Sequence, residues 1–112
     1  MERFDVLLVG AGLANSLIAL RLRATRPDLR LCMLEQEAVP TRSHTWSFFR
    51  TDVSVPIWTW LSHLAAHQWR GYTVSFPVHK RTIATNYAAL TSPDLRRAVE
   101  AALGQGLSLI HI

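Results

Sequence analysis

The chain has 112 residues, of which 49% are hydrophobic, and it carries a formal net charge of +4. This length is enough for one domain with a buried core, and the apolar content excludes an intrinsically disordered protein. The basic residues are scattered from Arg3 to Arg97 and cluster only at His79-Lys80-Arg81, so we expect no nucleic-acid partner.

The cysteine content and the first uncharged segment bear on where the protein works. Cys32 is the only cysteine, so no internal disulfide can form, and its apolar neighbours predict a small buried side chain. Residues 6–20 carry no charge, but this segment is shorter than the roughly 18 residues that span a bilayer. Glu2 and Asp5 do not fit the basic start of a signal peptide. We therefore expect a cytoplasmic protein, either free or in peripheral contact with the inner face of the cell membrane.

A strand, a glycine turn and a helix are predicted at the start of the chain. Phe4–Val9 is almost entirely apolar, as in a parallel strand that is covered on both faces. Apolar residues recur at helical spacing from Leu13 to Ala24, and Pro27 ends this helix. The apolar run Leu29–Leu34 is a second strand, which completes a βαβ unit.

The turn between the first strand and the helix has the pattern of a dinucleotide-binding loop. Gly10 allows the tight turn, Gly12 lets the backbone approach a pyrophosphate, and the N–H groups that follow Leu13 point toward that anion. Asn15 stands where the G-x-G-x-x-G pattern has its third glycine, which is a departure from the motif. Because glycines also occur in turns that bind no ligand, the alternative is an ordinary βαβ turn.

Glu35 follows the second strand, 23 residues after Gly12. A carboxylate about 20 residues beyond the glycines is the acceptor that the ribose hydroxyls of a dinucleotide need. No basic residue stands beside Glu35 to accept a 2′-phosphate, so NADP is disfavoured. The alternative interpretation is an exposed acid at a strand end that binds no ligand.

Thr41–Arg50 interrupts the pattern of strands and helices and is predicted to be a loop with large side chains. Within it, His44 and Trp46 are candidate substrate-binding residues that would line a ligand pocket. A histidine beside aromatic residues is equally often a packing residue, so both interpretations stay open.

Pro56 opens a second predicted helix. The tryptophans of Trp58–Trp69 either belong to the core or contact a large apolar ligand or a bilayer surface. His63 and His67 have the spacing of two metal ligands on a helix, but no Glu or Cys nearby completes a site, so we expect no metal.

The second half of the chain predicts a small antiparallel insert followed by a helix. Tyr72–Phe76 alternates large apolar and small polar residues, as a half-buried strand does. Arg81–Leu90 returns as a second strand after a turn at His79-Lys80-Arg81. Ser92 caps a helix that Gly104 ends.

Four stretches of the sequence, Asp5–Arg23, His44–Phe48, Trp69–Tyr72 and Tyr87–Ser92, carry a family resemblance. Through them the chain resembles the bacterial lycopene beta-cyclases of carotenoid biosynthesis, over residues 4–104. The His-Thr-Trp-Ser-Phe block is specific, whereas the glycine motif alone fits many nucleotide-binding families. Asn15 becomes a family trait, because the family's glycine motif runs into Leu-Ala-Asn.

This resemblance implies an α/β fold: a Rossmann-like FAD/NAD(P)-binding βαβ unit with a small antiparallel β-insert. The implied cofactor is reduced FAD, with NAD(P)H as the electron source. Residues of the glycine loop would hold the pyrophosphate, and Glu35 would hold the adenosine ribose. The loop residues are Gly10, Ala11, Gly12, Leu13 and Ala14.

The implied reaction is the cyclisation of the ends of lycopene to β-ionone rings, with β-carotene as product and no net redox change. Such an enzyme is an intramolecular lyase, and its apolar substrate would come from the membrane. The family's catalytic acidic segment lies beyond residue 112, so no catalytic residue is assigned here and these residues alone are expected to be inactive. The alternatives are a fragment of an NAD- or FAD-dependent oxidoreductase and a non-catalytic nucleotide-binding fragment.

Residues 1–104 are accordingly predicted to be the N-terminal part of an FAD-binding domain, and residues 105–112 a non-native tail. The reason is that Leu107–Ile112 resembles the translation of a sequencing-library adapter. The alternative for this segment is an ordinary edge strand.

Overall fold

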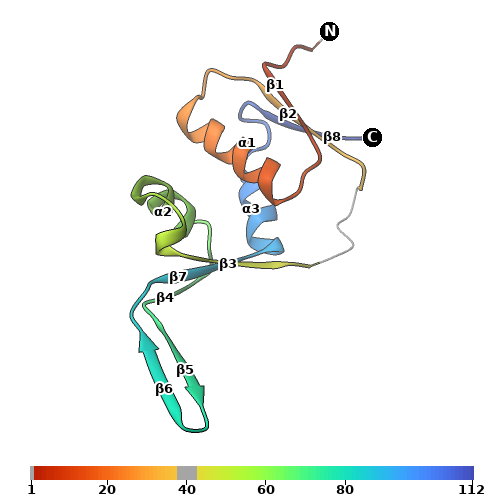
Figure 1. Ribbon diagram of the computed structural model, residues 1–112. Helices are drawn as coiled ribbons and strands as arrows, with labels where there is room; N and C mark the ends of the chain where they lie inside the picture. Colours follow the sequence, from red (N-terminus) through yellow and green to blue (C-terminus); the bar gives the residue numbers. More distant parts are fainter. Residues whose placement is uncertain (1, 38–42) are drawn as a thin grey trace. The chain divides into compact units, whose positions relative to one another are not determined.

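The structure is a computed structural model that describes residues 2–37 and 43–112 (Figure 1). It is a mixed α/β fold, as predicted. The elements in chain order are β1 (Val6–Val9), α1 (Leu13–Thr25), β2 (Leu31–Glu35), β3 (Thr45–Phe49), a 3₁₀ turn (Arg50–Asp52), α2 (Val55–Ser62), β4 (His67–Trp69), β5 (Tyr72–Phe76), β6 (His79–Ile83), β7 (Tyr87–Thr91), α3 (Ser92–Ala102) and β8 (Leu107–His111).

The chain forms two compact units. Unit 1 comprises Met1–Ser43 and Leu95–Ile112, and unit 2 comprises His44–Asp94. Unit 1 contains a parallel sheet, whereas the sheets of unit 2 are antiparallel.

The sheet of unit 1 has the strand order β1-β2-β8, and both pairings are parallel. Its central strand is covered on both faces, because the successive residues Leu31, Cys32 and Met33 are all fully buried. The predicted βαβ unit is therefore present, and the prediction of a buried Cys32 is confirmed. Such complete burial explains the continuous apolar run that the sequence shows here.

Helix α1 packs through small residues. Ser16 and Ala19 are buried together with Leu20, and small side chains on this face let the helix come close to the strands. Leu20 belongs to the predicted apolar stripe, but Ala24, at its far end, is exposed. The buried face is thus rotated toward the smaller residues.

In unit 2, the prediction of a loop over Thr41–Arg50 is wrong for Thr45–Phe49, which forms β3; residues 41 and 42 lie outside the described residues. Strand β3 pairs antiparallel with β7, and β7 pairs antiparallel with β4. The half-buried Trp46 and Phe48 alternate with exposed neighbours along β3. The strand forms because β7, more than thirty residues away in sequence, supplies its hydrogen-bond partners.

The predicted antiparallel insert is present, but its boundaries differ. Tyr72–Phe76 is β5, as predicted, whereas His79-Lys80-Arg81 belongs to β6 and the turn lies at Pro77-Val78. The predicted single strand Arg81–Leu90 is divided between β6 and β7. Proline at the first turn position explains the shift, because its fixed φ favours a turn and it cannot donate to a strand ladder.

Helix α3 begins with a reciprocal capping box, but Thr91 and not Ser92 is its cap. The Thr91 N–H donates to Asp94 Oδ2 at 3.0 Å, and the Asp94 N–H donates to Thr91 Oγ1 at 3.3 Å. The Ser92 hydroxyl instead accepts the His44 N–H at 2.7 Å, which fixes the start of β3 beside the end of β7. Sequence reasoning placed the cap one residue too late.

Strand β8 occupies residues that were predicted to be a tail. Leu107–His111 pairs with β2, and the Leu107 side chain is only 1% exposed. The pairing matches the alternative of an edge strand for this segment. The prediction that residues 105–112 are non-native concerns their origin and stays a prediction.

Candidate functional site

The glycine loop joins β1 to α1 in unit 1. Gly10 has φ +97°, a left-handed conformation that favours glycine, and its N–H donates to Leu34 O at 2.6 Å. Gly12 has an ordinary φ of −77° and is the N-cap of α1. A Cβ atom built on Gly12 meets no atom within 4 Å. The loop is therefore open at Gly12, and the backbone conformation does not require glycine there.

The first turn of α1 leaves N–H groups available for an anion. The cap makes no side-chain hydrogen bond, and the first turn contains no acidic residue. Among the residues that the structure describes, the N–H groups of Gly12, Leu13 and Ala14 have no hydrogen-bond acceptor. These groups and the positive end of the helix dipole together favour a bound anion.

Asn15 explains how the loop does without the third glycine of the motif. Its side-chain amide donates to Val9 O at 2.8 Å and to Gly10 O at 2.9 Å. These two bonds tie the first turn of α1 to the end of β1. The larger residue therefore stabilises the tight turn by hydrogen bonding, a role that the motif comparison alone did not predict.

Glu35 ends β2 beside the glycine loop, as the sequence predicted. Its Oε2 accepts the Ala11 N–H at 2.7 Å, and its Oε1 accepts the N–H groups of Gln36 and Glu37 at 2.8 and 3.2 Å. The backbone hydrogen bond from Ala11, followed by that from Glu37, lowers the pKa of Glu35 below its usual value. The site thus combines the charged carboxylate at the end of β2 with N–H groups of the adjacent glycine loop that have no acceptor among the described residues.

His44 and Trp46 belong to unit 2, whereas the glycine loop belongs to unit 1. Their rings are stacked with centroids 5.5 Å apart and an interplanar angle of 25°. His44 is exposed, and Trp46 is half-buried. The structure brings these two residues together, and their role in substrate binding stays a prediction.

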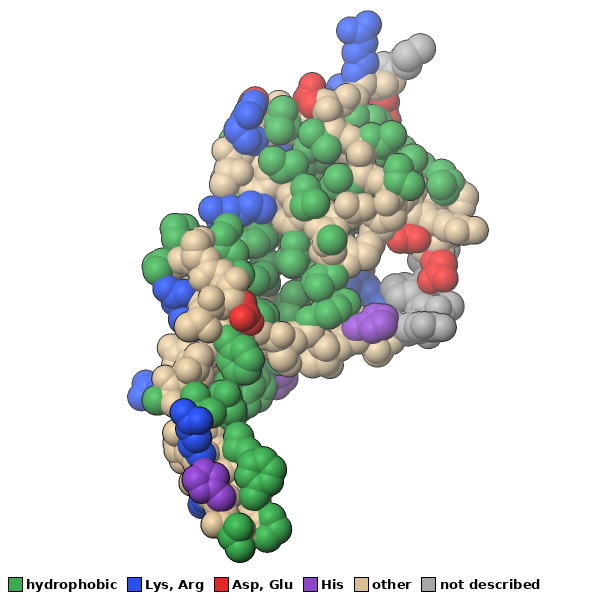
Figure 2. All heavy atoms as spheres, in the orientation of Figure 1, with side chains coloured by type: hydrophobic (Ala, Val, Ile, Leu, Met, Phe, Trp, Pro, Cys, Tyr) green, Lys and Arg blue, Asp and Glu red, His purple; other side chains and the backbone are tan. Residues whose placement is uncertain are grey.

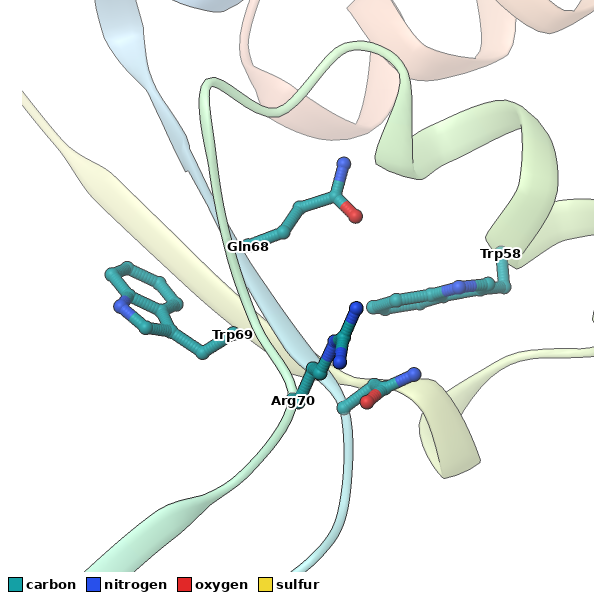
Figure 3. Close-up of a pocket in the computed structure, with 5 residues that line it drawn as sticks. Trp58, Gln68, Trp69 and Arg70 are labelled. Atoms are coloured by element: carbon teal, nitrogen blue, oxygen red, sulfur yellow. The ribbon is translucent and has the colours of Figure 1, made fainter.

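Unit 2 contains an open pocket of about 280 Å³ (Figure 3). In Figure 3 the Arg70 side chain extends toward Trp58, whereas Trp69 points away from it. The Gln68 side chain donates to Ser62 O at 2.8 Å. The lining residues are Trp58, Gln68, Trp69, Arg70 and Asn86. Sequence reasoning singled out the tryptophans but missed the polar residues, because separate elements contribute them.

Trp69 also belongs to an aromatic cluster on the strands of unit 2. It stacks on Tyr87, its partner across the β4–β7 pair, with centroids 4.6 Å apart and an angle of 18°. Tyr72 meets Tyr87 edge-on at 6.0 Å, and Phe49 lies 5.7 Å from Tyr72. Trp69 nevertheless remains 43% exposed. The cluster therefore both stabilises strand pairing and presents an aromatic surface.

Two further predictions concern metals and membranes. His63 follows the end of α2 and His67 lies in β4, so they do not share a helix as predicted. Within residues 2–37 and 43–112, no three His, Cys, Asp or Glu side chains gather where they could hold a metal ion. In the same ranges, no helix has the length and apolar character needed to cross a membrane.

Comparison with known proteins gives one family. The model of the family described as lycopene cyclase protein matches residues 5–110. The chain is 44% identical to the lycopene beta-cyclase of Pseudescherichia vulneris over 105 residues, which are 94% of this chain and 27% of that protein. For the lycopene beta-cyclase of Pantoea ananas the identity is 36% over 104 residues, covering 93% of this chain and 27% of the relative.

A third relative, the lycopene beta-cyclase of a Paracoccus species, is 48% identical over 95 residues. These residues are 85% of this chain and 25% of the relative. The chain thus spans about a quarter of the length of these curated relatives.

Proposed function

Because the chain belongs to the lycopene cyclase protein family, we propose that it is part of an enzyme that cyclises the ends of lycopene to β-ionone rings, with β-carotene as product. The observation that carries this proposal is the identity of 36–48% to three lycopene beta-cyclases over most of the chain. It favours a cyclase over an NAD-dependent oxidoreductase or a nucleotide-binding fragment without activity. The activity belongs to the whole protein, of which these residues correspond to about a quarter.

The proposed reaction is an isomerisation with no net redox change, which makes the enzyme an intramolecular lyase. A proton adds to a terminal double bond, a carbon–carbon bond closes the ring, and a proton leaves. The acid must be kept from water, and negative charge must stabilise the carbocation. We assign no residue of this chain as the proton donor.

The glycine loop supports a site for FAD in a Rossmann-like unit. The open space at Gly12 suits the close approach of a pyrophosphate, and Leu13 and Ala14 offer N–H donors to it. Gly10 and Ala11 would shape this loop. When bound, reduced flavin would supply negative charge that stabilises the carbocation, and NAD(P)H is the electron source that we expect for its reduction.

Glu35 would hold the adenosine ribose. The backbone hydrogen bond from Ala11 lowers the pKa of this carboxyl and so favours its charged form. An ionised carboxylate has about four acceptor sites, and three backbone N–H groups already donate to Glu35, so one ribose hydroxyl can still donate to it. The same bonds hold the carboxylate against the loop before a ligand binds, which reduces the cost of ordering the side chain.

Unit 2 would contribute apolar surface for the polyene. In the cluster of Phe49, Trp69, Tyr72 and Tyr87, the rings of Phe49 and Trp69 are exposed, and aromatic side chains provide large contact area for apolar ligands. His44 and Trp46, stacked on one another, are the further candidates for substrate contact.

The test is a chimera in which residues 5–110 replace the matching segment of the Pseudescherichia vulneris lycopene beta-cyclase. It is expressed in a bacterium that accumulates lycopene, and the extracted pigments are separated by chromatography. We expect β-carotene, with the unchanged relative as the positive control. A chimera that is present at the same level as the relative but leaves all the lycopene unchanged would contradict the proposal.

A further inference from the structure

The β5–β6 hairpin of unit 2 ends in an apolar tip. Strands β5 and β6 extend away from β4 and β7 and are joined by the two-residue turn Pro77-Val78 (Figure 1). Val78 is 98% exposed and Phe76 is 63% exposed. Two-residue hairpin turns favour Gly, Asn or Asp. Turn geometry therefore does not account for a valine at this position.

The register of the hairpin places a histidine and an arginine beside these apolar residues. Phe76 lies opposite His79, and Val74 lies opposite Arg81, so these four side chains share one face of the hairpin. Lys80 lies on the other face. Figure 2 shows hydrophobic, basic and histidine side chains gathered along this part of the molecule. The tip is thus apolar, and the strands behind it are basic.

No negative charge offsets these cations along this stretch of sequence. Residues 53–93 contain no Asp or Glu, although they include Arg70, Lys80 and Arg81. The acids that bound this stretch are Asp52 and Asp94. The Lys and Arg residues between Asp52 and Asp94 therefore have no acidic residue beside them in sequence.

We propose that the β5–β6 hairpin docks onto an anionic lipid bilayer, with Phe76 and Val78 entering the interface and Lys80 and Arg81 at the lipid phosphates. Anionic headgroups attract exposed Lys and Arg, and the region beneath them accepts apolar side chains. A nucleic acid would also attract the basic side chains, but it has no apolar region into which an aliphatic valine could insert. This inference goes beyond the proposed function and does not depend on the cofactor site.

The experiment measures binding of the detergent-purified chimera to lipid vesicles by flotation after the detergent is removed. One set of vesicles is phosphatidylcholine alone, and the other also contains phosphatidylglycerol. We expect flotation with the anionic vesicles, weakened by salt, because salt screens the attraction between exposed charges. Equal binding to both kinds of vesicle would overturn the electrostatic part of the proposal.

A matched pair of valine substitutions tests the tip. Val78→Asp should weaken vesicle binding about tenfold or more, because the apolar contact of the valine side chain with the bilayer interface is lost. Val55→Asp introduces the same change at the start of α2, where Val55 is 59% exposed, and should leave binding unchanged. Equal effects of the two substitutions would overturn the assignment of the tip.

A second pair tests the cations without altering the apolar residues. Lys80→Gln combined with Arg81→Gln should weaken binding about thirtyfold, from the attraction of two cations to an anionic surface. Arg30→Gln combined with Arg96→Gln removes the same charge at two exposed positions elsewhere in the segment and should have little effect. If both pairs weaken binding equally, net charge rather than the hairpin is responsible, and the proposal is wrong.

Cyclisation of lycopene in detergent, measured on the same proteins, separates the two proposals. All hairpin variants should keep this activity. If Val78→Asp abolishes this activity together with the folded state, the tip packs against other parts of the protein, and the docking proposal fails.

Binding to a nucleic acid is a separate outcome. Tighter binding to single-stranded RNA than to anionic vesicles would also overturn the docking proposal. A chimera that binds vesicles through the hairpin but never cyclises lycopene would instead contradict the proposed function.

Discussion

The two units of the protein expose different chemistry. In unit 1, the central strand β2 is buried, and the loop beside it presents N–H groups and the Glu35 carboxylate. In unit 2, no residue of β4, β5 or β6 is buried, and these strands include aromatic and basic side chains. Parallel strands need cover on both faces, whereas antiparallel strands tolerate solvent on one. This difference supports the proposals of an anionic ligand at unit 1 and of apolar or membrane contacts at unit 2.

Residues 1–112 expressed alone should show neither the activity of the whole protein nor a stable fold. We expect no β-carotene in a lycopene-accumulating bacterium, and no compact monomer in gel filtration. On β1, Leu7 and Val9 are 55% and 72% exposed, and a sheet with such apolar positions and unpaired edges tends to aggregate. The chimera is the positive control. β-Carotene formed by these residues alone would show that they contain the proton donor.

Gly12→Val in the chimera should abolish flavin retention, with a loss of about a hundredfold or more in affinity. The side chain would fill the open space at the loop, while the ordinary φ of Gly12 lets the variant fold. Flavin fluorescence after gel filtration measures retention, and circular dichroism checks the fold. Ala24→Val makes a similar change at the exposed end of α1 and should retain flavin. Undiminished retention by Gly12→Val would refute the loop as the pyrophosphate site.

Glu35→Gln should weaken flavin binding less, by roughly ten- to a hundredfold, because it removes the charge from a hydrogen bond to the ribose. Titration of the apoprotein with FAD measures the dissociation constant. Glu37→Gln removes the same charge two residues away and serves as the matched control. If both variants bind FAD equally well, the ribose contact is not made by Glu35.

The lowered pKa of Glu35 also predicts a pH dependence of stability. The folded protein keeps this carboxylate charged where the unfolded chain already binds a proton, so its stabilising effect is complete above the usual Glu pKa of about 4.3. It is lost as the pH falls further, through the lower pKa of the folded state. Urea unfolding of the chimera in a pH series should show this loss, and Glu35→Gln should reduce it. If the variant loses stability at low pH to the same extent, Glu35 is not the group responsible.

The stacking of Trp69 on Tyr87 in unit 2 should make a small contribution to the free energy of unfolding. A double-mutant cycle with Trp69→Leu and Tyr87→Leu should give a coupling free energy of about 1 kcal/mol, as expected for stacked aromatic rings. Chemical unfolding of the chimera supplies the four free energies. The control cycle pairs Tyr87 with Trp58, whose ring instead contacts Phe48, and should give coupling near zero. Equal coupling in both cycles would mean that the Trp69–Tyr87 stack adds no specific stability.

Much of unit 1 was predictable because its signals are local. An apolar run, two glycines, a helical stripe and a second run ending in Glu35 lie within one short segment. A βαβ unit brings the ends of its two strands together, so the meeting of Glu35 with the loop follows from sequence. The hydrogen bonds of Asn15 to Val9 and Gly10 did not follow, because they depend on the final positions of those carbonyl groups.

By itself, the sequence determined the family, the βαβ unit and the residues of the glycine loop, since each depends on the order of neighbouring residues. Only the tertiary structure decided that Thr45–Phe49 is a strand and that Arg70 and Asn86 line one pocket with Trp58. The physical reason is the same in both cases. A strand needs hydrogen bonds from a partner distant in sequence, and a pocket needs side chains from several elements, and neither leaves a periodic pattern in its own segment.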